Sequence, residues 1–205
     1  TKYLSGGATA FGGIIIDHGN FDWNLNPCIT KYSAKFGKGA FIARLRKNIY
    51  RNTGTSMTPQ IAKLMIQGID ILEIRVQRCY ENCIALGQFL QTHNKVKRVD
   101  YPGLENNPEY PLARKQFRGI PGTILSFDLE SKEACFGFMN KLEIIRRATN
   151  LNDNKSLIIH PYSTIYCEFT ENERNEAGIR DTMLRLSVGI ENAGDLIADI
   201  SQALE

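Results

Sequence analysis

No stretch of this sequence approaches the roughly 18 consecutive apolar residues that a membrane-spanning helix needs. A strong net charge is also absent, because 25 Lys and Arg stand against 22 Asp and Glu, which leaves +3 over 205 residues. The two signs alternate along the chain, whereas nucleic-acid and anionic-membrane surfaces gather charge of one sign. The sequence therefore predicts no nucleic-acid partner and no membrane partner.

Patterns for metal binding are missing as well. The three histidines lie far apart, the five cysteines form no Cys-x-x-Cys pair, and neither a His-Glu-x-x-His segment nor a Walker loop occurs. No metal site is expected. Cys79 and Cys83 could meet on one helical face, but without further ligands we interpret them as core residues. An odd number of cysteines with no apolar signal segment ahead of them favours a reducing, cytoplasmic location.

The chain opens with TKYLSGGATAFGG, in which a lysine lies beside four glycines. Glycine allows positive φ and a close approach of the backbone to a ligand. Lysine is the residue that forms Schiff bases with carbonyl cofactors, yet a lysine near a terminus is usually only a solvated charge. These residues alone leave both interpretations of Lys2 open.

Hydrophobic periodicity predicts the first elements. The β-branched run GGIIID, residues 12–17, is typical of a strand buried on both faces. Thr58 and Pro59 form a good helix start. Apolar residues then recur every three or four positions as far as Leu90, which predicts one long helix or two in series, with Gly68 as the natural break.

Strands and helices alternate in the second half of the chain. Strands are expected at 122–129 and 184–190, and helices at 131–142, up to Gly178, and from Asn192 onward. This alternation predicts a small α/β sandwich with one helical layer. The length suffices for one sizeable core, or for one domain with part of a second.

The strand LRLSVGI carries a single charged residue. Because side chains alternate along a strand, its apolar residues share one face and Arg185 lies on the other with Ser187. An arginine in this position either faces water at an edge or binds an anion, since the guanidinium fork matches a carboxylate. The spacing leaves both interpretations open.

Five segments, taken in order, resemble successive blocks of one enzyme family. They are TKYLSGG, NTGTSMTPQIAKLMIQGIDILEIRVQRCYENCIALGQFL, VDYPGLENNPEYPLARKQF, GTILSFDL and LRLSVGIENAGDLIADISQAL. On these segments the chain is identified as a member of the cysteine and methionine metabolism family of pyridoxal-phosphate (PLP) enzymes. That family includes cystathionine γ-synthase, the γ-lyases and O-acetylhomoserine sulfhydrylase, and the resemblance covers essentially the whole chain.

The resemblance implies roles for four residues. Lys2 matches the lysine that bonds covalently to PLP and moves protons in the reaction, and Thr1 matches a residue that hydrogen-bonds the cofactor phosphate. Arg185 matches the arginine that binds the substrate α-carboxylate. Asn150 lies where many relatives have serine and is expected to contact the substrate.

The resemblance also implies an architecture. The fold class is α/β: the end of the large domain of a fold-type I, aspartate aminotransferase-like PLP enzyme in residues 1–68, and a C-terminal α/β domain with a small, mostly antiparallel sheet in residues 69–205. The chain is expected to be the C-terminal half of a longer enzyme, whose N-terminal half supplies the other cofactor contacts. The family implies a homotetramer, a dimer of dimers.

Two features favour O-acetylhomoserine sulfhydrylase within the family, namely Asn150 and the insertion GNFDW at 19–23. The implied reaction belongs to methionine biosynthesis and replaces the acetate of O-acetyl-L-homoserine by sulfide. Alternatives are a methionine or cystathionine γ-lyase, cystathionine γ-synthase, or a non-catalytic assembly fragment. HPYSTIY departs from the family's HPASTTH at Tyr162, Ile165 and Tyr166, which puts the γ-substituent in question. The 205 residues alone are expected to be inactive.

Overall fold

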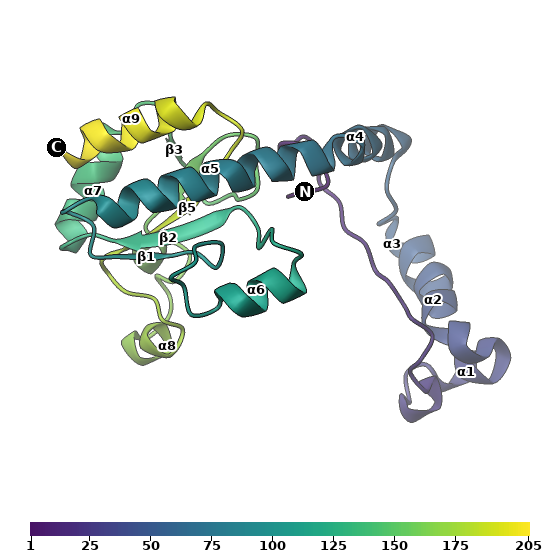
Figure 1. Cartoon of the computed structure of the whole chain (residues 1–205). Coiled ribbons are helices and arrows are strands. Elements are labelled where there is room, and N and C mark those ends of the chain that lie inside the picture. Colours follow the sequence, from purple (N-terminus) through teal and green to yellow (C-terminus); the bar gives the residue numbers. More distant parts are fainter. The chain divides into compact units, whose positions relative to one another are not determined.

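The computed structural model describes residues 1–205 and divides them into two compact units. The sheet unit consists of Thr1–Thr9 and Leu64–Glu205, and the helical unit consists of Ala10–Lys63. Figure 1 labels their elements. The boundary expected between residues 68 and 69 from the family resemblance stays a prediction.

The helical unit is built from short helices. Trp23 stacks on Phe41, with ring centroids 4.9 Å apart and an interplanar angle of 10°, and Phe21 packs on Trp23 at 4.7 Å. The aromatic residues of the GNFDW segment thus contribute to the packing of this unit. Its elements are η1 (Trp23–Leu25), α1 (Thr30–Phe36), η2 (Gly37–Gly39), α2 (Ala40–Arg44), the π-helical η3 (Leu45–Tyr50) and α3 (Arg51–Thr53).

A strand was expected at 12–17, and this expectation is wrong. The residues of this run take part in no strand, and Ile14 and Ile16 are 75% and 69% exposed. A strand exists only where its backbone N–H and C=O groups pair with a neighbour. No strand of the described chain pairs with this run, so its β-branched composition alone does not make it one.

The sheet unit contains one five-stranded sheet in the order β1-β2-β5-β4-β3. Only β3 and β4 run parallel, so the sheet is mostly antiparallel, as the α/β fold class predicted. In the centre, β5 pairs with both β2 and β4, and Arg185 lies opposite Ser126 and Ile159. The strands are β1 (Arg98–Asp100), β2 (Ile124–Asp128), β3 (Arg146–Arg147), β4 (Leu157–Ile159) and β5 (Met183–Ser187).

Three helices form the predicted helical layer and share one core with the sheet (Figure 1). They are α5 (Leu72–Thr92), α7 (Lys132–Lys141) and α9 (Ala193–Leu204). Leu184 and Leu186 of β5 are fully buried in this core. Truncating such a side chain to alanine typically costs about 2–5 kcal/mol. The remaining helices are α4 (Pro59–Asp70), α6 (Tyr110–Gln116), η4 (Pro161–Ser163) and α8 (Glu171–Glu176).

The long apolar periodicity from Thr58 corresponds to two helices in series, α4 and α5, but they do not separate at Gly68. The break is at Ile71, and Gly68 lies inside α4. A Cβ at Gly68 would lie 2.2 Å from the carbonyl oxygen of Leu4. Glycine is therefore required there for close packing of the N-terminal segment on α4, and it does not end the helix.

The cysteines divide by burial. Cys79, Cys83 and Cys135 lie in the interior, where burial raises the pKa of Cys79 to about 11 and that of Cys135 to about 12. Cys28 and Cys167 are exposed. No three His, Cys, Asp or Glu side chains come together to ligate a metal. None of the helices has both the length and the apolar character to cross a bilayer.

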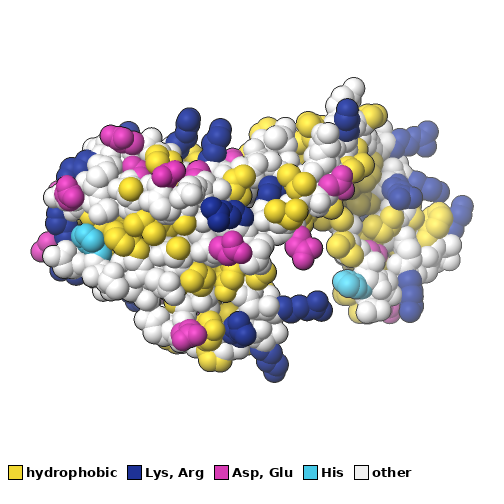
Figure 2. Space-filling view, turned by 45° about the horizontal axis from the view of Figure 1, so that its top comes forward, with side chains coloured by type: hydrophobic (Ala, Val, Ile, Leu, Met, Phe, Trp, Pro, Cys, Tyr) yellow, Lys and Arg dark blue, Asp and Glu magenta, His cyan; other side chains and the backbone are white.

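Hydrophobic side chains also reach the surface (Figure 2). On α4, and from there into the start of α5, the most exposed of them are Ile66, Ile69, Ile71 and Ile74. The apolar stripe of these helices is thus wider than the face that the core of the sheet unit covers.

A buried carboxylate connects α9 to the chain that follows α7. Oδ1 of Asp199 accepts the backbone N–H of Glu143 at 2.8 Å, and Oδ2 accepts those of Ile144 at 3.0 Å and Ile145 at 2.9 Å. These three consecutive N–H groups lie beyond the end of α7, and the carboxylate of Asp199 supplies their hydrogen-bond acceptor. This contact fixes the turn that leads from α7 into β3.

We expect Asp199→Ala to lower the free energy of unfolding by about 3 kcal/mol, because three amides lose a charged acceptor. Asp195→Ala, on the same helix but exposed, should cost less than about 1 kcal/mol. Urea denaturation of both variants measures the difference. Equal losses would contradict the role assigned to Asp199.

Candidate active site

Lys2 lies in the N-terminal segment of the sheet unit. Its Nζ donates a hydrogen bond to Oδ1 of Asn150 at 2.8 Å, across 148 positions of sequence. It forms no salt bridge, since the three ion pairs of the structure involve other residues. The amine thus meets a neutral amide oxygen, which holds its position without tying it to a carboxylate.

Arg185 reaches the same loop from β5. Its Nη2 donates to the carbonyl oxygens of Thr149 at 3.0 Å and Asn150 at 3.4 Å. Its Nε is buried without a hydrogen-bond partner, and no carboxylate pairs with the guanidinium. Burial lowers the pKa of Arg185, and the nearby Tyr166 acts in the opposite direction. A half-buried cation with an unused donor is suited to an anion.

The structure thus places three of the four predicted site residues around one loop. Lys2 and Arg185 both bind the loop at Asn150, one through the side chain and the other through the backbone. Thr1 precedes Lys2, and its carbonyl oxygen accepts a hydrogen bond from the hydroxyl of Ser5 at 2.7 Å. The phosphate contact expected of Thr1 stays a prediction.

Two further asparagines of this loop were not predicted as site residues. Asn152 has a positive φ of 57°, its backbone N–H donates to Ser187 at 2.7 Å, and its Oδ1 accepts from Thr123 at 2.9 Å. Nδ2 of Asn154 donates to the carbonyl oxygen of Gly6 at 2.8 Å. The alternation of asparagine in TNLNDN was the available signal, because asparagine tolerates left-handed backbone and bonds backbone groups.

The segment that departs from the family pattern, HPYSTIY, contains η4, which contacts β5, the strand that carries Arg185. Arg174 holds the segment in place, because its guanidinium lies 4.2 Å from the centre of the Tyr162 ring and its Nε donates to the carbonyl oxygen of Tyr166 at 2.8 Å. The ring of Tyr166 packs on Phe169 at 5.1 Å. This segment is therefore placed to influence what binds beside Arg185.

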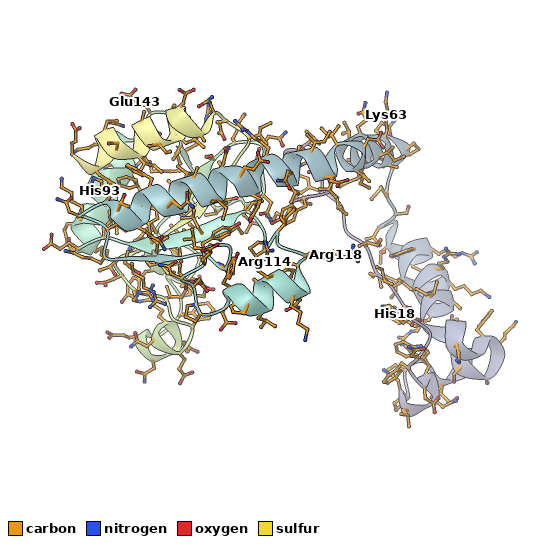
Figure 3. The ribbon with its side chains drawn as sticks, viewed as in Figure 1. His18, Lys63, His93, Arg114, Arg118 and Glu143 are labelled. Atoms are coloured by element: carbon orange, nitrogen blue, oxygen red, sulfur yellow. The ribbon has the colours of Figure 1, made fainter.

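Other titratable groups lie elsewhere. His93 follows the end of α5, where its ring lies 5.9 Å from that of Phe89, and His18 belongs to the helical unit (Figure 3). His160 is buried and bonds Ser163 and the carbonyl oxygen of Asp181, as expected of a structural histidine. None of the three contributes to the Lys2 site.

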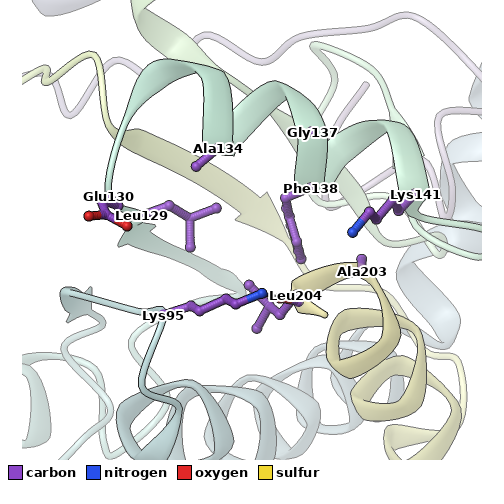
Figure 4. A pocket seen from close by; sticks show the side chains of 9 residues that line it. All are labelled: Lys95, Leu129, Glu130, Ala134, Gly137, Phe138, Lys141, Ala203 and Leu204. Carbon is purple, nitrogen blue, oxygen red and sulfur yellow. Dashed lines mark hydrogen bonds between the residues drawn. The ribbon is translucent and has the colours of Figure 1, made fainter.

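A hollow of about 250 Å³ lies between α7 and the end of α9, and Figure 4 shows its lining. Lys95 enters it, and its Nζ donates to the carbonyl oxygens of Leu204 and Glu205. The rest of the lining is largely apolar, with Phe138 and Leu129 among its residues. No predicted site residue takes part in it.

The residues present fit the lysine-bound end of PLP. Lys2 offers a primary amine without a carboxylate partner, which is the group that condenses with an aldehyde. Behind it, Gly6 and Gly7 have φ of 75° and 118°, which lets the backbone turn sharply. The orphaned Nε of Arg185 fits a carboxylate on the amino acid that such a cofactor would carry.

The fold matches that of solved structures of PLP-dependent enzymes. The sequence profile described as "Cys/Met metabolism PLP-dependent enzyme" matches residues 1–205. The chain therefore belongs to this family, whose cofactor is PLP.

The relatives found by comparison agree with this assignment. The chain is 34% identical to O-acetyl-L-homoserine sulfhydrylase 1 of Thermus thermophilus, over 100% of the chain and 51% of that protein. It resembles the structure of O-acetylhomoserine sulfhydrylase from Wolinella succinogenes with 43% identity and a TM-score of 0.75, covering 93% of the chain and 51% of that structure.

A further solved structure, from Campylobacter jejuni, contains N'-pyridoxyl-lysine-5'-monophosphate. The chain matches it with 37% identity and a TM-score of 0.76, over 80% of the chain and 39% of that structure. The chain spans about half the length of the curated relatives described above.

We expect Thr123→Val to loosen the loop of residues 149–155, called the asparagine loop below. The change keeps the shape of a buried side chain but removes the hydroxyl that bonds Asn152, which should cost about 1–3 kcal/mol in the free energy of unfolding. Thr92→Val, at the exposed end of α5, removes a similar hydroxyl and should cost less than about 0.5 kcal/mol. Urea denaturation compares them, and the same cost for both would argue against a buried network.

Proposed function

We propose that these residues form part of a PLP-dependent sulfhydrylase. It converts O-acetyl-L-homoserine and sulfide into L-homocysteine and acetate. The observation that carries the proposal is the convergence of Lys2 and Arg185 on Asn150, because it brings an amine and a guanidinium, neither with a carboxylate partner, to one loop. Relatives named O-acetylhomoserine sulfhydrylase support the choice within the family.

The chemistry of the cofactor is its own: when bound, PLP offers an aldehyde to an amine and a ring that draws electrons from the bonds of Cα. The protein supplies the groups around it. The amine of Lys2 would take the proton from Cα of the substrate and return protons later in the reaction. The amide oxygen of Asn150 keeps Nζ beside the substrate while it does so.

Arg185 has a positioning task. By binding the α-carboxylate, it fixes the direction of the Cα–H bond relative to Lys2, which lowers the entropy lost on the way to the transition state. Once Nη2 is bound to the loop, Nε and Nη1 are the nitrogens of the guanidinium without a hydrogen-bond partner, and they supply the donors for this carboxylate. Thr1 is assigned to the phosphate of the cofactor.

The assignment brings further expectations about the whole protein. Its partners are a small amino acid and sulfide, and an N-terminal half supplies the remaining cofactor contacts. The large-domain end at 1–68 and the C-terminal domain at 69–205 follow the family division. We also expect the whole protein to form a homotetramer and to lie in the cytoplasm.

The reaction is tested with the full-length protein. Homocysteine should form from O-acetyl-L-homoserine and sulfide far faster than thiol or ketoacid forms from methionine or cystathionine alone. Faster breakdown of the latter two would favour a γ-lyase, and faster use of cysteine than of sulfide would favour cystathionine γ-synthase.

We expect Lys2→Ala to lower turnover by at least about 10³-fold, since the proton-transferring amine is lost. The visible absorption of the lysine-bound cofactor should disappear, and borohydride should no longer attach the cofactor to the peptide that contains residue 2. Lys155→Ala removes an exposed lysine from the asparagine loop and should leave all three readouts unchanged. Full activity of Lys2→Ala would refute the assignment.

For Arg185→Ala we expect kcat/KM for the amino-acid substrate to fall about 10- to 100-fold, mostly through KM, as a charged hydrogen bond is lost. The control is Arg147→Ala on β3, whose exposed guanidinium bonds only Asn140. Steady-state kinetics at several substrate concentrations separate the two constants. An unchanged KM in Arg185→Ala would place the carboxylate elsewhere.

A further inference from the structure

A second arginine lies beneath the Lys2 segment. Arg75 of α5 is only 7% exposed, and it forms no salt bridge. Its Nη2 donates to the carbonyl oxygen of Tyr3 at 2.7 Å and to that of Gly68 at 3.0 Å. Tyr3 directly follows Lys2, so the guanidinium is one residue away from the amine-bearing position.

Such a placement is costly for a helix that needs only an apolar side chain at its buried face. A buried guanidinium without a counter-charge loses hydration that two carbonyl oxygens replace only in part, and Nε of Arg75 is buried with no hydrogen-bond partner. An apolar side chain would stabilise this position better than arginine. The hydrogen bonds that Nη2 of Arg75 donates therefore indicate a role other than stability.

The contacts around it show two surfaces held together. The backbone of Leu4 and Ser5 runs directly over Gly68, where an added Cβ would lie 2.2 Å and 2.6 Å from their atoms. Arg75 joins the same two pieces, the N-terminal segment and α4, through one nitrogen. Figure 1 shows this segment beside the junction of α4 and α5.

The other side of the segment is held by the asparagine loop. Asn154 bonds the carbonyl oxygen of Gly6, and Asn150 accepts from Lys2 itself. Without Arg75, the stretch between Lys2 and Gly6 would keep contacts to the loop but lose its donor on the helix side. The backbone next to Lys2 would then be free to shift.

We propose that Arg75 is the positioning residue for Lys2. It clamps the carbonyl oxygen of Tyr3 to the end of α4 and so sets the distance of the Lys2 amine from Asn150 and Arg185. It touches no reacting atom. This inference rests on the proposed function for its kinetic consequence, while the clamp itself is a property of the chain.

The test uses Arg75→Lys and Arg75→Met in the full-length protein. Hydrogen exchange of residues 1–9, measured without cofactor, should become at least about tenfold faster than in the parent, whereas exchange in β5 and α9 should stay the same. With cofactor, kcat should fall about 10- to 100-fold, because misplacement of a reacting group by about 1 Å costs this much. KM for the amino acid should change less than about threefold, since Arg185 is untouched.

Two comparisons accompany the Arg75 variants: Arg78 on the same helix, and Gly68 on α4, where the N-terminal segment packs. Arg78→Lys and Arg78→Met alter a half-buried arginine whose ion pair is with Glu81, at 4.0 Å, and should change nothing. Gly68→Ala leaves Arg75 in place but pushes the segment off α4, and it should speed exchange of residues 1–9 and lower kcat as the Arg75 variants do. If Arg75→Met does not fold, Arg75→Lys carries the test, because it keeps the charge but lacks the guanidinium that spans both carbonyl oxygens.

Parent-like exchange of residues 1–9 in the Arg75 variants would overturn the proposal. So would faster exchange throughout the sheet unit, which would indicate a general structural role, or an unchanged kcat. Failure of the proposed function is distinguishable: borohydride would then label no Lys2 in the parent protein, while exchange without cofactor would still decide whether Arg75 clamps the segment.

Discussion

The pairing of β5 with strands on both sides determines where the charged groups of this protein lie. Backbone hydrogen bonds to β2 and β4 hold β5 in one register, with Leu184 and Leu186 in the core and Arg185 on the opposite face. A slip of one residue would move the guanidinium into the core and both leucines out of it, which is unfavourable for all three side chains. The guanidinium of Arg185 is therefore placed by the hydrophobic effect acting on its neighbours.

The asparagine loop brings Arg185 of this strand together with Lys2 of the N-terminal segment. It binds Ser187 through Asn152, receives Arg185 through its carbonyl oxygens, and holds the N-terminal segment through Asn150 and Asn154. The loop thus connects two parts of the chain that are more than 140 positions apart. Since its contacts are hydrogen bonds with defined direction, they fix geometry more than they add stability.

Sequence reasoning reached the fold class, and three of the residues that it named, Lys2, Asn150 and Arg185, lie together at one loop. The alternation around Arg185 predicted the central strand, the helix signals at Thr58, Ser131 and Asn192 predicted real helix starts, and the five resembling segments predicted the family that the profile match shows. It failed where a pattern has two physical causes. GGIIID has strand composition but no pairing partner, and Gly68 reads as a helix break although it serves a close backbone contact. Arg75, Asn152 and Asn154 were missed because their partners are distant in sequence.

The two edges of the sheet are short and charged. On one side, β3 consists only of Arg146 and Arg147, both exposed, and on the other β1 carries Arg98 paired with Asp100 at 3.7 Å. Charged residues on brief edge strands discourage the addition of a further strand from another molecule. Growth of this sheet by intermolecular strand pairing is therefore opposed at both ends, so any self-association of the sheet unit must use side-chain surfaces and leave the backbone ladder closed.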